Sequence, residues 1–312
     1  MDRATRIGVV GATGAVGRVT LELLRERGYE NVRAFASARS AGRRVGELVV
    51  EEATPEALAA GDLDLCLFSV GTARSRELVP HAVRGDAVVV DKSSAYRLEE
   101  GVPLVVPEVN GGRAQEHTGI LANPNCCTIP LTMALRPLHD AAGLSRARVS
   151  TYQSASGAGS ERMAELMATP PGEANLGMDW PFDGEEFDEE TKLRQETRKV
   201  LELPDLPISA TCVRVPVLVG HAEAVWIETG RPLSAGEARE VLADAPGIRV
   251  EEFPTPRDAT ETDDVLVGRI RRDPTVENGL VLFVVADNLR KGAALNAIQI
   301  AELLPAPRTV AA

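Results

Sequence analysis

The chain has 312 residues, which favours two domains over one. Hydrophobic residues make up 44% and charged residues 26% of the chain, a composition that excludes wholesale disorder. The formal net charge is −12, so we do not expect a nucleic-acid partner, and the lack of a long apolar stretch or a signal peptide predicts a cytoplasmic protein with no membrane contact.

Short apolar runs alternate with helical or loop segments through the first part of the chain. We predict strands at residues 6–10, 32–36, 63–70, 87–90 and 104–106. A glycine-rich turn and an amphipathic segment follow the first of these runs, as in the opening of a dinucleotide-binding unit. This α/β alternation predicts a Rossmann-type, doubly wound parallel sheet.

The pattern changes after Asn125, where strands come in runs. We predict helices at 128–142, 160–167, 189–201, 234–243 and 293–304, and strands at 148–153, 210–215, 222–228, 265–271 and 280–286. Such a succession indicates a second, α+β domain with a mixed sheet. The expected domains are residues 1–127, joined by the C-terminal helix 290–312, and residues 128–289. The segment 170–190, rich in Pro, Gly, Asp and Glu, is expected to be a surface excursion.

The first strand runs into the sequence GATGAVG at residues 11–17. Glycines at this spacing permit a tight turn and a close approach of backbone to a pyrophosphate, which the helix N-terminus then binds. The residues expected to contact the cofactor are Gly11, Thr13, Gly14, Ala15 and Val16. The alternative is a plain glycine-rich turn.

The loop after the second strand predicts which dinucleotide is bound. An NAD site usually carries a carboxylate here for the ribose, but no acid lies between Val32 and Gly46. The loop offers Ser37, Arg39 and Ser40 instead, and an arginine suits a 2′-phosphate. We therefore expect NADP(H), with a merely polar loop as the alternative.

The four cysteines differ in their surroundings. Cys66 and Cys212 lie in apolar runs and are expected to be buried strand thiols. There is no CxxC pair, so no metal site is expected. Cys126 follows Asn125 at the start of a predicted helix, where the helix dipole favours a nucleophilic thiolate and Asn125 could stabilise an oxyanion. A buried helix-start cysteine is an equally good interpretation of these residues alone.

A candidate acid/base lies in the segment Arg214–His221. Histidine is the usual residue for proton transfer near neutral pH, and His221 begins a predicted strand. The other three histidines, His81, His117 and His139, are expected to be structural or exposed. Arg214 stands among valines and needs an anion, which could be a substrate carboxylate or a nearby acid of the chain.

Together these patterns resemble the aspartate-semialdehyde dehydrogenase family, over nearly the whole chain. The resemblance is carried by GATGAVG, SARSAG, VPEVN at 106–110, PNC at 124–126, STYQSASGAG at 150–159, ATCVRVPVLVGH at 210–221, VGRIRRD at 267–273 and VVADNLRKGAALNAIQIAE at 284–302. The PNC, YQ-SGAG and RVPV…H blocks are specific when they occur together.

The resemblance implies a role for each matching residue. Cys126 is the thioester nucleophile, His221 the acid/base, and Gln153 the residue that orients the thioester. Substrate binding falls to Arg97, Asn125, Glu189, Lys192 and Arg214: Arg214 pairs with the α-carboxylate, Glu189 with the amino group, and Lys192 with Arg97 binds phosphate. Ser156, Gly157 and Asn288 contact the cofactor. Without the resemblance, Glu189 and Lys192 read as an exposed helix-surface pair.

The implied activity is the reversible, NADPH-dependent reduction of L-aspartyl-4-phosphate to L-aspartate 4-semialdehyde and phosphate. This reaction belongs to the biosynthesis of lysine, threonine, methionine and diaminopimelate. The resemblance assigns NADP binding to residues 1–127 and catalysis and dimerisation to 128–289, and it suggests a homodimer or homotetramer. The alternatives are a paralogue that acts on another acyl phosphate or thioester and a catalytically silent nucleotide-binding homologue.

Three features depart from the family pattern. Cys127 follows the nucleophile where a serine or another small residue is common, and Lys92 stands where asparagine is common. The stretch between Gly159 and Glu189 is also shorter, with MDWPFDG in place of the usual Asn-Pro segment. The last departure bears on the subunit interface and on part of the substrate pocket.

Overall fold

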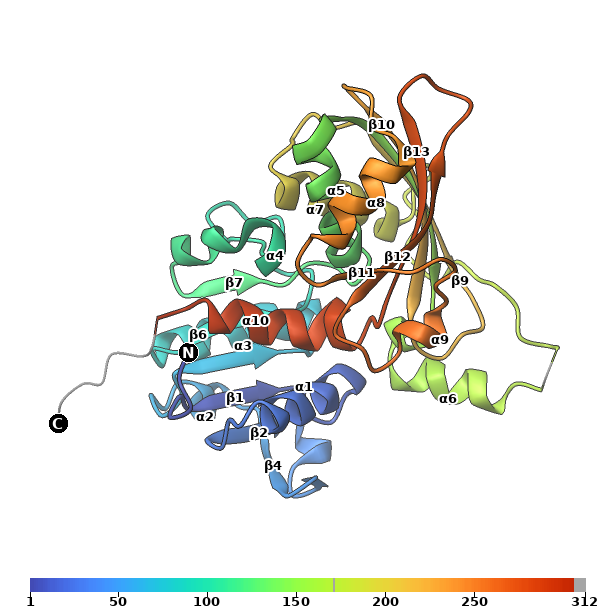
Figure 1. Ribbon diagram of the computed structural model, residues 1–312. Coiled ribbons are helices and arrows are strands. Elements are labelled where there is room, and N and C mark those ends of the chain that lie inside the picture. The colour runs from blue at the N-terminus through green and yellow to red at the C-terminus, as the bar shows by residue number, and fades with distance from the viewer. Residues whose placement is uncertain (171, 306–312) are drawn as a thin grey trace. The chain divides into compact units, whose positions relative to one another are not determined.

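The computed structural model describes residues 1–170 and 172–305, which form two compact units (Figure 1). The first unit runs from Met1 to Pro124 and resumes at Ala293, and the second runs from Asn125 to Gly292. The sequence placed these junctions at 127 and 289, three residues away from 124 and 292 in each case. The difference assigns Asn125 to the second unit, where its N–H donates to Glu196 Oε2 at 2.6 Å. Residues 306–312 of the predicted C-terminal segment lie outside the described residues.

The first unit is built on a seven-stranded sheet in the order β3-β4-β2-β1-β5-β6-β7. The strands are β1 (Ile7–Val10), β2 (Val32–Ala36), β3 (Arg44–Val45), β4 (Leu48–Glu52), β5 (Leu65–Phe68), β6 (Val88–Asp91) and β7 (Ile120–Ala122). All neighbours are parallel except β3 and β4, which form a hairpin. The strand order reverses at β1, which is where open α/β sheets bind their ligands.

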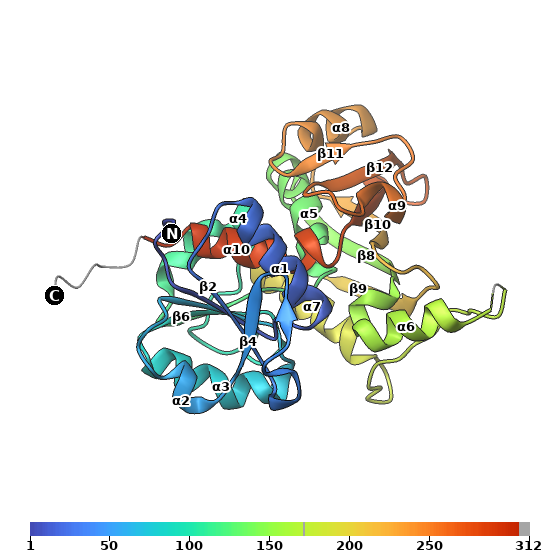
Figure 2. The same cartoon turned by 90° about the horizontal axis from the view of Figure 1, so that it is seen from below.

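Helices cover both faces of this sheet, because alternate strand residues point to opposite sides. Ile7 and Val9 pack with α1 (Ala15–Glu26) and α10 (Leu295–Glu302), whereas Val10 packs with α2 (Pro55–Leu58) and α3 (Thr72–Arg84). Figure 2 shows α1 with α10 on one side and α2 with α3 on the other. A short helix α4 (Pro107–Asn110) and 3-10 turns at Ala38–Ser40 and Gly111–Glu116 complete the unit.

The Rossmann-type sheet is therefore confirmed, but its last strand was misplaced in the sequence analysis. The segment 104–106 contributes only an isolated bridge from Leu104 to Ala122, and β7 is the edge strand. The segment stands between Pro103 and Pro107, and proline has no N–H for a ladder hydrogen bond. The hairpin β3–β4 was not predicted.

The second unit contains a six-stranded sheet in the order β11-β12-β13-β10-β8-β9. Its strands are β8 (Leu144–Gln153), β9 (Ile208–Arg214), β10 (His221–Thr229), β11 (Ile248–Val250), β12 (Val265–Arg272) and β13 (Gly279–Ala286). The pairs β8–β9 and β11–β12 are parallel and the others antiparallel, which confirms the predicted mixed sheet.

Helices α5 (Thr128–Ala142), α7 (Asp188–Leu201) and α8 (Ala235–Ala243) pack on one face of this sheet (Figure 1). Two further helices are α6 (Ser160–Ala168) and α9 (Pro256–Ala259), and a 3-10 turn spans Ala155–Ala158. On the opposite face Trp226, Phe253 and Phe283 border a shallow hollow of about 300 Å³. Arg269 and Arg271 also line this hollow, so the opposite face carries an apolar patch bordered by charged residues.

The register of the second sheet brings three strand ends to one edge. Gln153 ends β8 and pairs with Arg214, which ends β9. β10 begins at His221, one residue before the pair formed by Ala222 and Tyr152. Residues far apart in sequence thus meet at this edge. No helix within the described residues is long and apolar enough to span a membrane.

Candidate active site

Cys126 lies two residues before α5 begins, at the N-terminal end of this helix. Cys127 is the N-cap residue of this helix, and its N–H donates to Asn125 Oδ1 at 2.8 Å. This bond fixes the turn that presents the thiol of Cys126 beside the positive end of the helix dipole, which favours thiolate. Gly292 packs against Cys126, since a Cβ at Gly292 would be 3.3 Å from Cys126 Cβ.

His221 is buried, with 1% of its surface exposed, and its ring orientation is set by Ser154. The backbone N–H of Ser154 donates to Nδ1 at 3.0 Å, so Nδ1 carries no proton and the neutral ring carries it on Nε2. Nε2 has no hydrogen-bond partner among the described residues. Gly157 leaves room for this edge of the ring, because a Cβ at that position would lie 3.0 Å from Nε2. The site therefore holds a buried N–H ready to donate to a ligand.

The thiols of Cys126 and Cys127 and a ring nitrogen of His221 lie within 4.8 Å of one another. Such proximity suits proton exchange between a thiol and an imidazole. The same three atoms are metal-ligand types. Our expectation of no metal site stays a prediction, because these residues meet through the fold and not through a CxxC pair.

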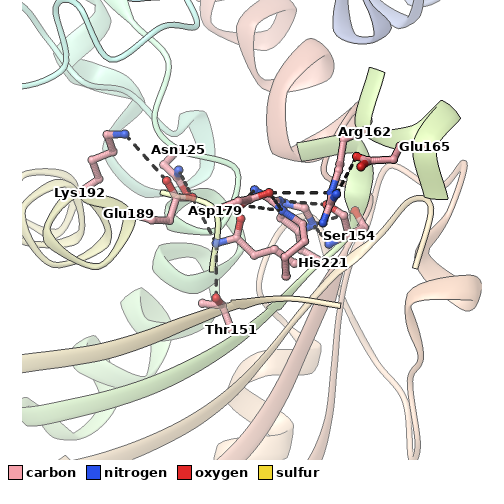
Figure 3. Close-up of polar contacts among 11 residues, drawn as sticks. Asn125, Thr151, Ser154, Arg162, Glu165, Asp179, Glu189, Lys192 and His221 are labelled. Atoms are coloured by element: carbon pink, nitrogen blue, oxygen red, sulfur yellow. Dashed lines mark hydrogen bonds and ion pairs between the residues drawn. The ribbon is translucent and has the colours of Figure 1, made fainter. Parts of the chain in front are cut away.

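Asn125, Gln153 and Glu189 form a buried polar network, in which Figure 3 labels Asn125 and Glu189. Glu189 Oε1 accepts from Asn125 Nδ2 at 2.8 Å and from Gln153 Nε2 at 3.2 Å. Burial raises the pKa of Glu189, and the nearby Cys126 sulfur raises it further. The network holds both amides in defined orientations at the edge where the strand ends meet.

Lys192 lies one turn along α7 from Glu189, as their spacing predicted. Its Nζ is 4.0 Å from Glu189 Oε2 and also pairs with Asp188. The side chain of Glu189 is only 8% exposed and that of Lys192 is 23% exposed. The two residues are thus not the exposed surface pair that was the alternative interpretation.

Arg214 is paired with an acid of the chain, as one of our two alternatives allowed. Its Nη2 is 3.0 Å from Asp179 Oδ1 and its Nε is 3.3 Å from both oxygens of that carboxylate. Nη1 donates to the Ser154 carbonyl at 3.0 Å, and the ring of Trp180 stacks 4.6 Å from the guanidinium. Arg214 is 4% exposed, and the ion pair with Asp179 balances its buried charge.

Asn288 joins the segments that surround the histidine. Its Oδ1 accepts from the Gly220 N–H at 2.9 Å, from Ser154 Oγ at 3.0 Å and from Ser156 Oγ at 3.1 Å. Ser156 and Asn288 were expected to contact cofactor, and they lie within this network beside Gly157. Their hydrogen bonds within the protein support the orientation of His221, and contact with cofactor remains a proposal.

Glu223 was missed by the sequence analysis. It is 1% exposed, and neither carboxyl oxygen has a hydrogen-bond partner of suitable geometry among the described residues. Burial raises its pKa well above the ordinary value, the Cys126 sulfur adds to the shift, and the Cys127 thiol opposes it. Strand alternation could have predicted this position, because Glu223 stands two residues after His221 and therefore on the same face of β10.

The nucleotide-type turn lies in the first unit. Gly11 has φ +94°, and a Cβ there would lie 2.3 Å from Ser69 O, while a Cβ at Gly17 would lie 2.2 Å from Gly11 O. Both positions require glycine. Gly14 is the N-cap of α1 and is exposed, with Thr13, Ala15 and Val16 partly exposed around it. The helix N-terminus is thus open to a phosphate group, as a dinucleotide requires.

The remaining predicted residues of the first unit lie in two places. Ser37 and Arg39 are exposed and Ser40 is partly exposed, in the turn that follows β2. Arg97 is buried, and its guanidinium donates to the carbonyls of Asn123 at 3.0 Å and Lys92 at 2.7 Å. Arg97 belongs to the first unit and Lys192 to the second, so a joint phosphate site remains a proposal.

Most of the predicted catalytic and substrate-binding residues lie in one unit of the structure. Within the second unit lie Asn125, Cys126, Gln153, Ser156, Gly157, Glu189, Lys192, Arg214, His221 and Asn288. A cysteine before a helix N-terminus and beside a buried histidine, on a chain that also carries a dinucleotide-type turn, indicates the class of nicotinamide-dependent dehydrogenases.

Comparison with known proteins agrees with this class. Residues 6–117 match the family model described as semialdehyde dehydrogenase, NAD binding domain, and residues 135–291 match semialdehyde dehydrogenase, dimerisation domain. The chain belongs to the aspartate-semialdehyde dehydrogenase family.

Individual relatives match over nearly their full length. The aspartate-semialdehyde dehydrogenase of Streptomyces akiyoshiensis is 46% identical, with 96% of this chain and 98% of the relative covered. That of Bacillus subtilis is 41% identical, with 97% and 98% covered. The crystal structure of aspartate semialdehyde dehydrogenase II from Vibrio cholerae superposes with a TM-score of 0.90 at 40% identity, covering 96% of this chain and 98% of that one.

Proposed function

We propose that the chain reduces L-aspartyl-4-phosphate to L-aspartate 4-semialdehyde with NADPH, through a thioester on Cys126, and that it serves amino-acid biosynthesis. The observation that carries the proposal is the placement of Cys126 before α5, with its sulfur within 4.8 Å of the buried His221 ring. The Vibrio cholerae relative has also been crystallised as a complex with ASA, at 40% identity and a TM-score of 0.89.

The first chemical step is acyl transfer. The Cys126 thiolate attacks the acyl carbon, a carbon–sulfur bond forms, and the carbon–oxygen bond to phosphate breaks. Lys192 and Arg97 are proposed to neutralise the departing phosphate, Lys192 after exchanging its contacts with Asp188 and Glu189. Gln153 and Asn125, held by Glu189, orient the thioester carbonyl.

The second step reduces the thioester to the aldehyde. Reduced nicotinamide, when bound, supplies the hydride. The Nε2–H of His221 donates a hydrogen bond to the oxygen that becomes negatively charged, and this charge returns to sulfur when the carbon–sulfur bond breaks. The Ser154 N–H keeps the ring in the tautomer that this donation needs.

The substrate is an amino acid, so the site needs groups for its two charged ends. We propose Arg214 for the α-carboxylate and Glu189 for the α-amino group. A buried arginine suits a carboxylate through two parallel N–H groups. Glu189 keeps Oε2 beside Lys192, while Oε1 accepts from the two amides.

The first unit fits a dinucleotide because Gly11 and Gly17, where a Cβ would collide with backbone, permit the tight turn that leads into the exposed N-terminus of α1. We propose NADP(H) over NAD(H), since the turn after β2 carries Arg39 and Ser40 and no acid. The crystal structure of aspartate semialdehyde dehydrogenase from Candida albicans, which is 26% identical with a TM-score of 0.78, is a complex with NADP.

A dimerisation domain is part of the matched family, and we propose a homodimer, or a tetramer built from it. The patch of Trp226, Phe253 and Phe283 on the second sheet is an apolar surface that such an association would cover. Cytoplasmic location stays a prediction.

The direct test follows absorbance of reduced nicotinamide with purified protein, L-aspartate semialdehyde, NADP and phosphate. Phosphate-dependent formation of NADPH is expected. A folded, NADP-binding protein without that signal would contradict the proposal. N-acetylglutamate semialdehyde, assayed in parallel, distinguishes a paralogue from a silent homologue.

A further inference from the structure

A short segment of the second unit lies across Arg214. We call residues 177–180 the Asp179 strap. Gly177 and Arg214 exchange two backbone hydrogen bonds, of 2.8 and 2.7 Å, which form an isolated antiparallel bridge. Two residues further on, Asp179 reaches the guanidinium, and Trp180 stacks 4.6 Å from it. The strap thus contacts Arg214 through backbone, carboxylate and aromatic ring.

The carboxylate of Asp179 takes the side of Arg214 that recognises carboxylates best. Nε and Nη2 present two parallel N–H groups, and both point to Asp179 at 3.0–3.3 Å. Nη1 donates to Ser154 O at 3.0 Å, and a Cβ at Gly157 would lie 2.9 Å from it. A second carboxylate therefore cannot make the same paired contact while Asp179 remains.

Two negative charges at one guanidinium also repel each other. The guanidinium is buried, whereas the Asp179 side chain is 34% exposed and able to turn outward. Arg162 is a second cation beside it: Nη1 pairs with Glu165 at 2.6 Å, and Nε faces Asp179 Oδ2 at 4.0 Å. The backbone bridge at Gly177 does not depend on the aspartate, so the strap can stay attached while its carboxylate moves.

We propose that Asp179 is a built-in competitor that occupies the carboxylate position of Arg214 and leaves it for Arg162 when substrate binds. The inference rests on the proposed function, because it takes Arg214 as the substrate-carboxylate residue. Its consequence is a lowered apparent affinity, since only the fraction of molecules with a released Arg214 binds substrate. The strap thereby weakens binding of any small carboxylate that cannot displace Asp179.

The test compares Asp179→Asn with the parent chain in phosphate-dependent NADPH formation. The substitution keeps shape and removes charge, so KM for L-aspartate semialdehyde is expected to fall about fivefold with kcat within about twofold, by the population argument above. Glu185→Gln is the matched control, since it removes the same charge from an exposed position of the neighbouring segment. A raised KM in Asp179→Asn, or an equal fall in both variants, would overturn the proposal.

The outcome separates the inference from the proposed function. If the parent chain shows no phosphate-dependent turnover, the proposed function fails. If the parent turns over and KM does not fall in Asp179→Asn, only the inference fails.

A binding measurement avoids turnover. The chain has two tryptophans, so Trp226→Phe leaves Trp180 as the sole indole. L-2-aminobutyrate, which has the α-carboxylate and amino group without a reactive carbonyl, is expected to change Trp180 emission saturably. It should bind about fivefold more tightly to the Asp179→Asn form of that variant. Equal affinity in the two forms would contradict the proposal.

Discussion

The backbone N–H of Ser154 donates to Nδ1 of His221 over 3.0 Å, and this contact decides which ring nitrogen carries the proton. A neutral ring held in this way can donate from Nε2 to an oxyanion.

We expect His221→Gln to lower kcat by a factor of about 10² to 10⁴, the usual contribution of a positioned proton-transfer group. KM and the circular dichroism spectrum should change little. Ser154→Ala is the matched control, because it removes the hydroxyl and keeps the N–H that fixes the ring. A loss in Ser154→Ala as large as that in His221→Gln would show that the hydroxyl, not the N–H, orients the ring.

The adjacent cysteines should behave differently. Burial raises the pKa of Cys127 well above its usual value, and the neighbouring Cys126 sulfur adds to this effect. Cys127 therefore stays a protonated thiol, while Cys126 is partly exposed. We expect Cys126→Ser to abolish turnover and Cys127→Ser to keep most of it, with alkylation by iodoacetamide mapped to Cys126 by mass spectrometry. Turnover that survives in Cys126→Ser and is lost in Cys127→Ser would contradict the assignment of Cys126 as the nucleophile.

Gly157 should be intolerant of a side chain for steric reasons. A methyl group there would lie 2.9 Å from Arg214 Nη1 and 3.0 Å from His221 Nε2. We expect Gly157→Ala to lower kcat/KM by roughly 10² while leaving the thermal midpoint nearly unchanged, because misplacing a catalytic group by an ångström has this order of effect. Gly112→Ala, which meets no atom within 4 Å, is the control and should be silent.

Glu223 should make stability depend on pH. Its pKa in the folded chain lies well above the ordinary value of 4.5, so the folded state binds the proton more tightly than the unfolded state. Its contribution to stability is therefore lost as pH rises from 4.5 toward the folded pKa.

Replacing this acid with its neutral amide removes that dependence. Relative to the parent, Glu223→Gln should gain up to about 1.4 kcal/mol of unfolding free energy per pH unit in this window, measured by urea denaturation at pH 5 and pH 8. Glu228→Gln, on the opposite face of the same strand, is the control. A parent–variant difference that is the same at both pH values would mean that folding does not raise the pKa of Glu223 into this range.

Cofactor preference should depend on the turn after β2. We expect NADPH to be preferred over NADH, and Arg39→Ala to lower kcat/KM for NADPH by about 10- to 100-fold, the range of one lost charge-assisted contact, while NADH is unaffected. Arg25→Ala, in the last turn of α1, is the control. Equal kcat/KM for NADPH and NADH in the parent would contradict a role of this turn in cofactor selection.

The sequence sufficed for much of the fold, because apolar runs and turn residues are local signals. The strand Val32–Ala36 and the helix Thr128–Ala142 have the predicted bounds. Leu104–Val106 has the composition of a strand but is flanked by prolines, so the sheet takes β7 instead. Whether a given apolar triplet pairs depends on its neighbours, which composition alone does not reveal.

In the candidate site, too, local sequence blocks were predictable, and contacts that the fold creates were not. Cys126 and His221 stand in recognisable blocks, and the fold brings them together. The pairing of Asp179 with Arg214 joins residues 35 apart through an excursion with no periodicity, so the sequence could only pose it as an alternative. Glu223 was missed because an acid in a strand is ordinary until its burial is known.

The first unit is assembled from both ends of the chain, and this affects how the protein can fold during synthesis. Ile7 and Val9 share a core with Leu295 and Ile298 of α10. Residues 125–292 must be translated between these segments, which takes roughly ten to thirty seconds at bacterial or eukaryotic rates. During that interval α1 covers its part of this face, but the apolar side chains that pack against α10 stay exposed until the last helix emerges.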